Sequence, residues 1–336
     1  MRTGEIPPRT AVVTGASAGV GRAVAQALAR RGWRLGLIAR DAGALEAVRR
    51  EAEAAGAPQV RVAAIDVADA DAMFDAAARF ARELGGIGLW VNNAMATVFG
   101  PVSALSPGEV RRVTEVTYLG YVHGTMAALR QMRAEDRGTI VQVGSALAYR
   151  AIPLQAAYCG AKFAIRGFTD ALRSELRHEG SRIRLTMVQL PAVNTPQFGW
   201  SRSHMPRRAQ PVPPIFQPHA VAEAICRAAE TAPRELWVGW SGIRAILGTM
   251  LAPGLLDRLL AGQGYAGQMT EEPRPPGQPD NLFAPAAGHH AEHSRFGAVA
   301  QPRVSAVNPA LLRGAGLAAL LLPAVIVAGR RLARRR

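Results

Sequence analysis

Short apolar runs alternate with alanine-rich stretches through the first 240 residues, and few folds accommodate that order. The seven runs, each of strand length, are TAVVTG, RLGLIA, VRVAAID, IGLWVNNA, GTIVQVGS, IRLTMVQL and RELWVG. The stretches between them, such as VGRAVAQALARRG and LEAVRREAEAAG, have the spacing of helices. Because strands that alternate with helices form parallel sheets, the sequence predicts an α/β fold with a doubly wound, seven-stranded parallel sheet.

The first apolar run ends in TGASAGVG, which places Gly15, Gly19 and Gly21 between a strand and a helix. Glycines at such a turn allow close approach of the backbone to a pyrophosphate, with a phosphate at the helix N-terminus. The spacing differs from the commoner G-x-G-x-x-G, and a glycine-rich turn can be no more than a turn. The strand, turn and helix in sequence favour dinucleotide binding.

Composition divides the 336 residues into three parts. With 49% hydrophobic and 19% charged residues the chain can build a large core, and we expect one domain at 1–240. From about residue 240 the regular alternation fades, and residues 262–309 are rich in Gly, Pro and His, so we expect a partly disordered extension at 241–309. Residues 310–336 are apolar with a basic end. Two cysteines, Cys159 and Cys226, and no apolar leader indicate that the bulk of the chain is cytosolic.

The formal net charge of +15 does not point to nucleic acid. Seven arginines and no acidic residue fall in residues 302–336, so much of the excess belongs to the tail. Basic and aromatic residues do not interleave as in nucleic-acid binders. The stretch GHHAEH, with His289, His290 and His293, lies in a Pro/Gly-rich segment without a rigid frame, so no metal site is predicted.

Lys162 is the only lysine among 40 basic residues, and it stands four residues after Tyr158. That spacing puts both side chains on one helix face. A phenol with a pKa of ~10 is a poor base near neutrality, and a neighbouring ammonium favours the phenolate. Ser145 ends the fifth strand, where it can donate a hydrogen bond to the substrate carbonyl oxygen that the tyrosine would protonate. Taken singly, Tyr158 could be an ordinary residue of an amphipathic helix, Lys162 a solvated charge and Ser145 a cap. Together they indicate Tyr158 as acid/base, Lys162 as the group that tunes it, and Ser145 as polariser of a carbonyl.

The motifs Thr14–Gly21, Asn92-Asn93-Ala94, Ser145 and Tyr158-x-x-x-Lys162 resemble the short-chain dehydrogenase/reductase family, over residues 8 to about 240. The resemblance implies a Rossmann-type fold with helices on both faces of the sheet, hydride transfer between an alcohol and a carbonyl, and a homo-oligomer. It also implies a nicotinamide coenzyme held by Gly15, Ser17, Gly19, Val20, Gly21, Asp66, Val67, Asn92, Tyr158, Lys162 and Thr195.

The sequence departs from the family pattern at three positions. In EVTYLG, Thr117 stands where the family has an asparagine that positions a water leading from the lysine toward solvent. We keep Thr117 as a catalytic candidate: its hydroxyl could take part in proton transfer between the lysine and solvent, or it could bond back to the backbone of its own helix. Met95 and Ala192 replace usual glycines, and both are expected to reshape the nicotinamide pocket.

The end of the second strand, LIARD, bears on the choice of coenzyme. Enzymes of this fold that use NAD place an acid there for the ribose 2′-hydroxyl, whereas this chain has Ala39 followed by Arg40. NADP is therefore favoured over NAD. Arg40 could also be one more surface charge, and Ala18 stands where some NADP enzymes add a second basic residue.

Residues 196–218 fall where family members carry a mobile lid. Its large apolar residues are Phe198, Trp200, Met205 and Phe216. They could close on a lipophilic carbonyl or alcohol substrate, or simply pack the loop down. The alternative function is a catalytically idle relative that binds NADP and acts as a membrane-associated scaffold or sensor, with Thr117 and Met95 as signs of decay.

Residues 314–336, GAGLAALLLPAVIVAGRRLARRR, are the candidate membrane segment. The uncharged run from Gly314 to Gly329 falls short of the ~30 Å hydrocarbon core as a helix of ~1.5 Å per residue. A full span would also carry the terminal arginines out of the cytoplasm, against the positive-inside tendency. We therefore expect a shallow or re-entrant anchor on the cytoplasmic side of a membrane, bent at Pro323.

Overall fold

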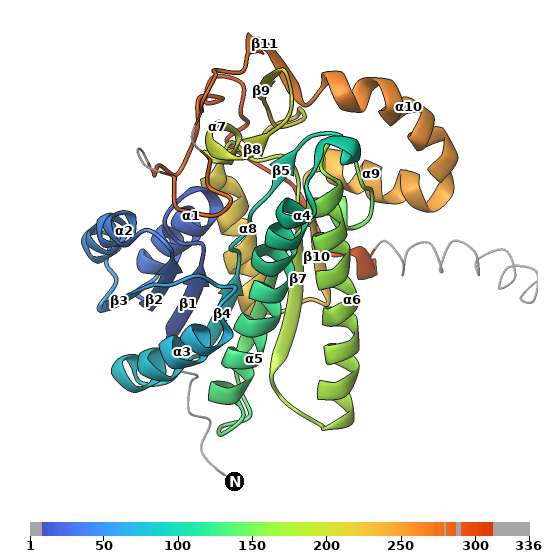
Figure 1. Ribbon diagram of the computed structural model, residues 1–336. Helices are drawn as coiled ribbons and strands as arrows, with labels where there is room; N and C mark the ends of the chain where they lie inside the picture. Colours follow the sequence, from blue (N-terminus) through green and yellow to red (C-terminus); the bar gives the residue numbers. More distant parts are fainter. Residues whose placement is uncertain (1–8, 279, 287–289, 312–336) are drawn as a thin grey trace, which may run out of the picture.

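The computed structural model describes residues 9–278, 280–286 and 290–311, and its centre is a twisted sheet (Figure 1). Within these residues the strand order is β3-β2-β1-β4-β6-β7-β10-β12. The parallel strands are β1 (Thr10–Thr14), β2 (Arg34–Ala39), β3 (Val60–Ala64), β4 (Leu89–Asn92), β6 (Thr139–Ser145), β7 (Arg184–Leu190) and β10 (Glu235–Val238). This confirms the predicted doubly wound parallel sheet. An eighth strand that was not predicted, β12 (Ala306–Val307), pairs antiparallel with β10.

Helices cover both faces of the sheet (Figure 1). One face carries α1 (Gly19–Ala29), α2 (Ala42–Ala54) and α8 (Pro218–Thr231). The other carries α3 (Ala70–Leu84), α4 (Pro107–Thr114), α5 (Gly120–Met132) and α6 (Ala156–His178). The first face is built largely from Ala, Val and Leu, so its small side chains let α1 and α8 pack closely over the sheet. The core thus lies in two layers, one on each side of the strands.

Short elements connect this frame at the carboxyl end of the strands. They are β5 (Val98–Phe99), η1 (Val102–Ala104), η3 (Ala146–Ala148), α7 (Gln197–Trp200), β8 (Arg202–Ser203) and β9 (Arg207–Ala209). A π-helical segment, η2 (Glu115–Leu119), joins α4 to α5. β5 pairs with β8, which ties the segment after β4 to the segment after β7. Parallel topology brings these connections to one edge of the sheet, the edge at which such folds bind ligands.

The glycine turn after β1 depends on two unusual conformations and one close approach. Gly15 and Gly19 have φ of +66° and +56°, a region that favours glycine. A Cβ on Gly21 would lie 2.2 Å from the Gly15 carbonyl oxygen, so only glycine lets α1 start this close to the turn. The turn therefore presents backbone, not side chains, at the sheet edge.

The extension beyond residue 240 is built into the fold. It forms α9 (Trp240–Leu251), α10 (Pro253–Ala266) and β11 (Met269–Pro273), which pairs with β9. The chain then passes over the glycine turn as a segment that we call the strap, residues 280–286 and 290–296 (Figure 1). After the strap, Gln301 N–H donates to Ile215 O at 2.8 Å, and β12 joins the sheet. Composition predicted a partly disordered extension, and its described residues include these helices and strands.

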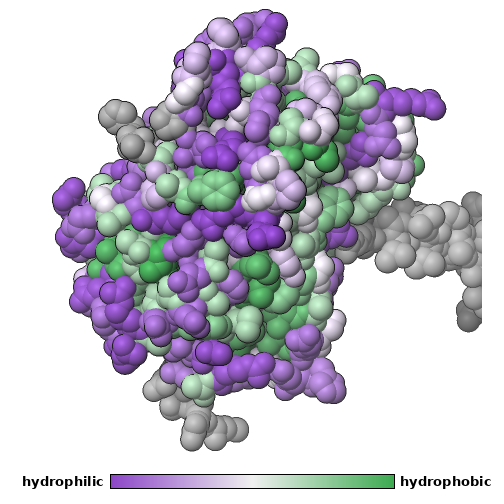
Figure 2. Space-filling model, viewed as in Figure 1, coloured by the Kyte–Doolittle hydropathy of each residue, from purple (hydrophilic) through white to green (hydrophobic). Residues whose placement is uncertain are grey.

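Apolar side chains gather on the outer surface of α5 and α6. Leu119, Met126 and Phe163 are each at least 36% exposed, and Figure 2 shows apolar surface over this pair of helices. Among the residues that the structure describes, no helix is long and apolar enough to cross a membrane. The expected anchor lies outside them from residue 312 onward.

Candidate active site

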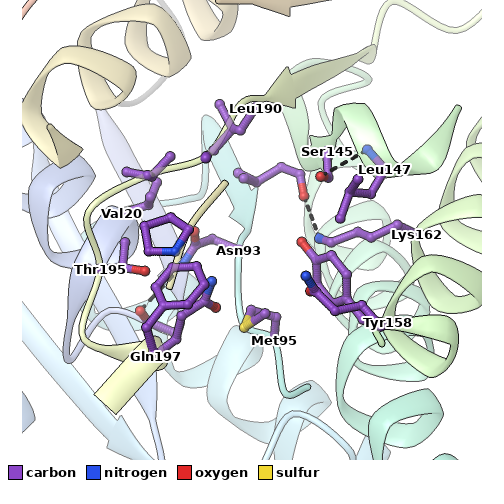
Figure 3. Close-up of a pocket in the computed structure, with 18 of the residues that line it drawn as sticks. Val20, Asn93, Met95, Ser145, Leu147, Tyr158, Lys162, Leu190, Thr195 and Gln197 are labelled. Atoms are coloured by element: carbon purple, nitrogen blue, oxygen red, sulfur yellow. Dashed lines mark hydrogen bonds between the residues drawn. The ribbon is translucent and has the colours of Figure 1, made fainter. Parts of the chain in front are cut away.

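A cavity of about 570 Å³ opens at the carboxyl edge of the sheet, between the glycine turn and α6 (Figure 3). It brings together most of the predicted site residues: Gly15, Ser17, Gly19, Val20, Arg40, Asp66, Val67, Ser145, Tyr158, Lys162 and Thr195. In Figure 3, Ser145, Tyr158 and Lys162 lie on one side of the cavity, with Val20, Thr195 and Gln197 on the other. Residues distant in the sequence thus meet in one space.

Ser145 and Tyr158 form the polar pair of this cavity. Ser145 ends β6, and its Oγ accepts a hydrogen bond from Leu147 N–H at 3.1 Å. Tyr158 is half-buried in the first turns of α6. Burial raises the pKa of Tyr158 above its usual range, and its hydrogen bond with Ser145 acts in the opposite direction. Two hydroxyls that meet in this way can both reach one substrate oxygen.

Lys162 is only 3% exposed, and its ammonium has two hydrogen-bond acceptors in the core. Its Nζ donates to Val143 O at 2.8 Å and to the Tyr121 hydroxyl at 3.0 Å. Burial lowers the pKa of Lys162 to about 7. The Nζ lies 5.6 Å from the centroid of the Tyr158 ring, and no described hydrogen bond joins the two side chains. The Lys162 charge and the Tyr158 ring thus face each other across this distance without a hydrogen bond between them.

In the structure the Thr117 hydroxyl has partners other than the lysine beside which it was expected. The Thr117 hydroxyl is fully buried, donates to Ala96 O at 2.7 Å and accepts from Ala96 N–H at 2.9 Å. It does not line the cavity. The hydroxyl thus bonds both the N–H and the carbonyl of one residue after β4, so Thr117 fixes that loop. Tyr121, one helical turn further on, takes the place beside Lys162.

Asn92 and Gly21 are also placed outside the cavity. The Asn92 amide accepts from Trp90 Nε1 at 2.8 Å and donates to Thr125 and Gln142 at 3.0 Å, all in the buried core. Successive strand residues face opposite sides, so the following residue, Asn93, faces the cavity instead. Its Nδ2 donates to Thr14 O at 3.0 Å. Gly21 contributes through close packing of the turn, as described above, and not through contact with the cavity.

The far end of the cavity, beyond β2 and β3, is rich in charge. The Arg40 guanidinium donates to Asn281 O and to Leu282 O in the strap. Asp66 accepts from Ala68 N–H at 3.0 Å and forms an ion pair with Arg112 of α4. Burial lowers the pKa of Arg40, an effect that Asp66 opposes. Arg40 thus stands charged beside the cavity with main-chain carbonyls as its described partners.

The strap also contacts the glycine turn. Gly19 N–H donates to Ala291 O at 3.0 Å, and Arg22 donates to His290 O. The His290 ring lies 5.2 Å from the ring of Trp200, between ring centroids, and its Nε2 lies 3.2 Å from the Asp41 carboxylate. Neither the strap nor Tyr121 was predicted. Tyr121 could have been found from its helical spacing to Thr117, whereas the strap carries no motif.

Known proteins resemble this chain in both sequence and structure. The sequence profile of the family described as short chain dehydrogenase matches residues 9–205. The chain belongs to this family. The chain is therefore an oxidoreductase of the short-chain dehydrogenase type.

Two relatives have names without an established reaction. The uncharacterized oxidoreductase YxnA of Bacillus subtilis is 29% identical over 292 residues, which are 86% of this chain and 82% of the relative. The putative oxidoreductase SadH of Mycobacterium tuberculosis is 35% identical over 187 residues, 56% of this chain and 67% of the relative. YxnA is thus similar well beyond the family profile, into the extension.

Two solved structures that resemble this chain contain a nucleotide. An alcohol dehydrogenase from the archaeon Thermococcus sibiricus, complexed with 5-hydroxy-NADP, has a TM-score of 0.59 and 29% identity, over 68% of this chain and 94% of that protein. A metagenomic short-chain oxidoreductase in complex with NADP has a TM-score of 0.55 and 28% identity, over 66% of this chain and 90% of that protein. These likenesses agree with the Rossmann-type sheet described above.

Proposed function

We propose that this short-chain dehydrogenase uses NADP(H) to interconvert a secondary alcohol and a carbonyl on a lipophilic substrate, with Tyr158 as acid/base. The observation that carries the proposal is the convergence of Ser145, Tyr158 and Lys162 on the cavity that the glycine turn also lines. A nicotinamide coenzyme supplies or accepts the hydride when bound. Everything else in the reaction is proton handling, for which this chain has the groups.

The three side chains divide the proton chemistry between them. In carbonyl reduction, the Tyr158 hydroxyl gives its proton to the developing alkoxide, and in alcohol oxidation the phenolate takes it back. The Ser145 hydroxyl donates a hydrogen bond to the same oxygen and stabilises its negative charge. The positive charge of Lys162 favours the phenolate of Tyr158. Burial alone raises the pKa of Tyr158 and so disfavours its phenolate, which gives the lysine charge a defined task.

The cavity has the features that a dinucleotide requires. Gly15 and Gly19 keep side chains away from the start of α1, where backbone N–H groups and the helix dipole favour phosphate. Ala39 leaves the end of β2 without a carboxylate, and Arg40 follows it with a guanidinium that could pair with a 2′-phosphate. The two nucleotide-bound neighbours, which hold NADP or its 5-hydroxy derivative, add support for NADP.

Apolar side chains support a lipophilic substrate. The end of the cavity away from Arg40 is lined by Leu147, Ile152, Val212, Leu256, Leu259 and Leu260. Of the large residues expected in the lid, Phe198 and Trp200 line the cavity, whereas Met205 and Phe216 are buried in packed clusters. An apolar ketone or alcohol would gain affinity by leaving water for such walls.

Two parts of the proposal concern assembly and location. The apolar surface over α5 and α6 supports a homo-oligomer, because exposed apolar patches are usual at contacts between subunits. Anchoring through residues 310–336 rests on their sequence, an apolar run followed by five arginines. Comparing membrane fractions of cells that express the full chain or residues 1–309 tests the anchor. Equal distribution of the two forms would contradict it.

A substrate screen tests the catalytic proposal. Purified protein is mixed with lipophilic ketones or alcohols, and coenzyme absorbance is followed with NADPH and NADH, or their oxidised forms. We expect turnover that Tyr158→Phe abolishes while coenzyme binding persists. Arg40→Ala should lower kcat/KM for NADPH more than for NADH. No turnover on any substrate, together with normal NADPH binding, would favour the idle scaffold or sensor instead.

A further inference from the structure

A second tyrosine lies directly beneath the catalytic lysine. Tyr121 of α5 is 1% exposed, and its hydroxyl donates to Val143 O at 2.8 Å while it accepts from Lys162 Nζ at 3.0 Å. The Nζ also donates to Val143 O and stands 4.6 Å from the centroid of the Tyr121 ring. The ammonium, the phenol and the carbonyl thus form a closed triangle in which each polar atom contacts the other two.

This triangle replaces the hydration that Lys162 loses on burial. An ammonium taken out of water is destabilised unless acceptors surround it. Here the acceptors are one carbonyl and one phenolic oxygen, and the Tyr121 ring adds the attraction of its π face. The pKa of Lys162, already lowered to about 7 by burial, shows how close the charged form is to being lost. Each remaining acceptor therefore matters to its protonation state.

Tyr121 itself keeps its proton. Burial, and next the proximity of Tyr158, raises the pKa of Tyr121 well above its usual range. The groups that face Lys162 from the elements around it are Tyr158 on α6, Tyr121 on α5, and Val143 O on β6. No described carboxylate contacts this ammonium. Tyr121 is consequently a fixed neutral partner, not a second acid or base.

We propose that Tyr121 is a positioning residue, whose hydroxyl orients the Lys162 ammonium and keeps it charged so that Lys162 can act on Tyr158. The Thr117 hydroxyl, which stands one turn before Tyr121, is bonded to Ala96 and has no described contact with Lys162. The catalytic meaning of this role rests on the proposed function, but the effect of Tyr121 on Lys162 does not.

The chain offers an unusually clean measurement, because Lys162 is its only lysine. Protein labelled with lysine that carries ¹³C at Cε gives a single side-chain signal, whose shift against pH reports the pKa of Lys162 directly. Tyr121→Phe keeps the ring and removes only the oxygen. A charged hydrogen bond of ~1.5–3 kcal/mol corresponds to about one to two pH units, so we expect the Lys162 pKa to fall by about one unit.

Tyr118→Phe is the matched control, since Tyr118 lies on the preceding turn and has no described bond to Lys162. Its Lys162 titration should match that of the wild type. An unchanged Lys162 pKa in Tyr121→Phe would overturn the proposal. If that variant does not fold, the wild-type protein still decides: a nuclear Overhauser contact between the Lys162 ε-methylene and the Tyr121 ring is expected, and its absence would count against the triangle.

Activity measurements then separate positioning from general damage. On a substrate found in the screen, Tyr121→Phe should lower kcat about tenfold or more, with coenzyme KM little changed. The acidic limb of alcohol oxidation should move to higher pH, because a neutral Lys162 leaves the Tyr158 phenolate without a neighbouring charge. A uniform loss with the wild-type pH profile would contradict the role. Absence of turnover in the wild type would refute the proposed function and leave the titration result standing.

Discussion

Replacing Gly21 with alanine adds one methyl group where the fold has no room for it. The new Cβ would lie 2.2 Å from the Gly15 carbonyl oxygen and 2.6 Å from Asn93 Nδ2, so the turn or the helix must shift. Overpacking of this kind costs ~1–3 kcal/mol, toward the upper end when backbone must move. Alanine returns ~1 kcal/mol through its helix propensity. We expect Gly21→Ala to be destabilised by about 2 kcal/mol and to bind NADPH at least tenfold more weakly.

Gly167→Ala is the control, because Gly167 is an exposed residue of α6 and an added Cβ would meet no atom within 4 Å. The same substitution should here stabilise the protein by up to ~1 kcal/mol. Urea denaturation followed by circular dichroism measures both variants, and NADPH fluorescence measures binding. Equal stability of the two variants would refute the argument from the close approach of the turn.

Three other predictions follow from single contacts. Thr117→Val should lower the free energy of unfolding by ~1–3 kcal/mol, because it leaves both polar groups of Ala96 without their partner, whereas Thr117→Ser should retain most of the stability in denaturant melts. Leu282→Ala removes a fully buried side chain that holds the strap in place, so calorimetry should detect tighter NADPH binding than in the wild type. Unchanged affinity would show that strap and coenzyme do not compete for Arg40. Burial raises the pKa of Glu109, but hydrogen bonds, including one with His204, bring it below the usual 4.5. The ionised carboxylate therefore stabilises the fold above that pH, and this stabilisation is lost as the pH falls below it. Glu109→Gln should make the free energy of unfolding depend less on pH in the acidic range.

Local spacing explains why much of the site could be predicted. Tyr158 and Lys162 share a helix face because four residues complete about one turn, and Ser145 ends a strand of a parallel sheet. Asn92 was misplaced because adjacent strand residues face opposite sides, and the paired asparagines do not reveal which one meets the cavity. The contact of Thr117 with Ala96 could not be predicted, because only tertiary packing decides which backbone groups a hydroxyl meets.

The strap could not be predicted for a different reason. It meets Gly19 and Arg40 through the main-chain carbonyls of Ala291, Asn281 and Leu282. Every residue carries a carbonyl, so such contacts leave no trace in composition or motif. The same holds for β12, whose two residues are too few for a periodic pattern.

The strap is fastened on both sides, by β11 on β9 before it and by β12 on β10 after it. A segment held in this way is an intramolecular ligand, whose effective concentration at the glycine turn is on the order of millimolar whatever the protein concentration. Contacts that would be negligible between separate molecules are then substantially formed. A phosphate-bearing ligand that needs Gly19 N–H and Arg40 meets a resident competitor, and its apparent affinity scales with the fraction of molecules in which the strap is released.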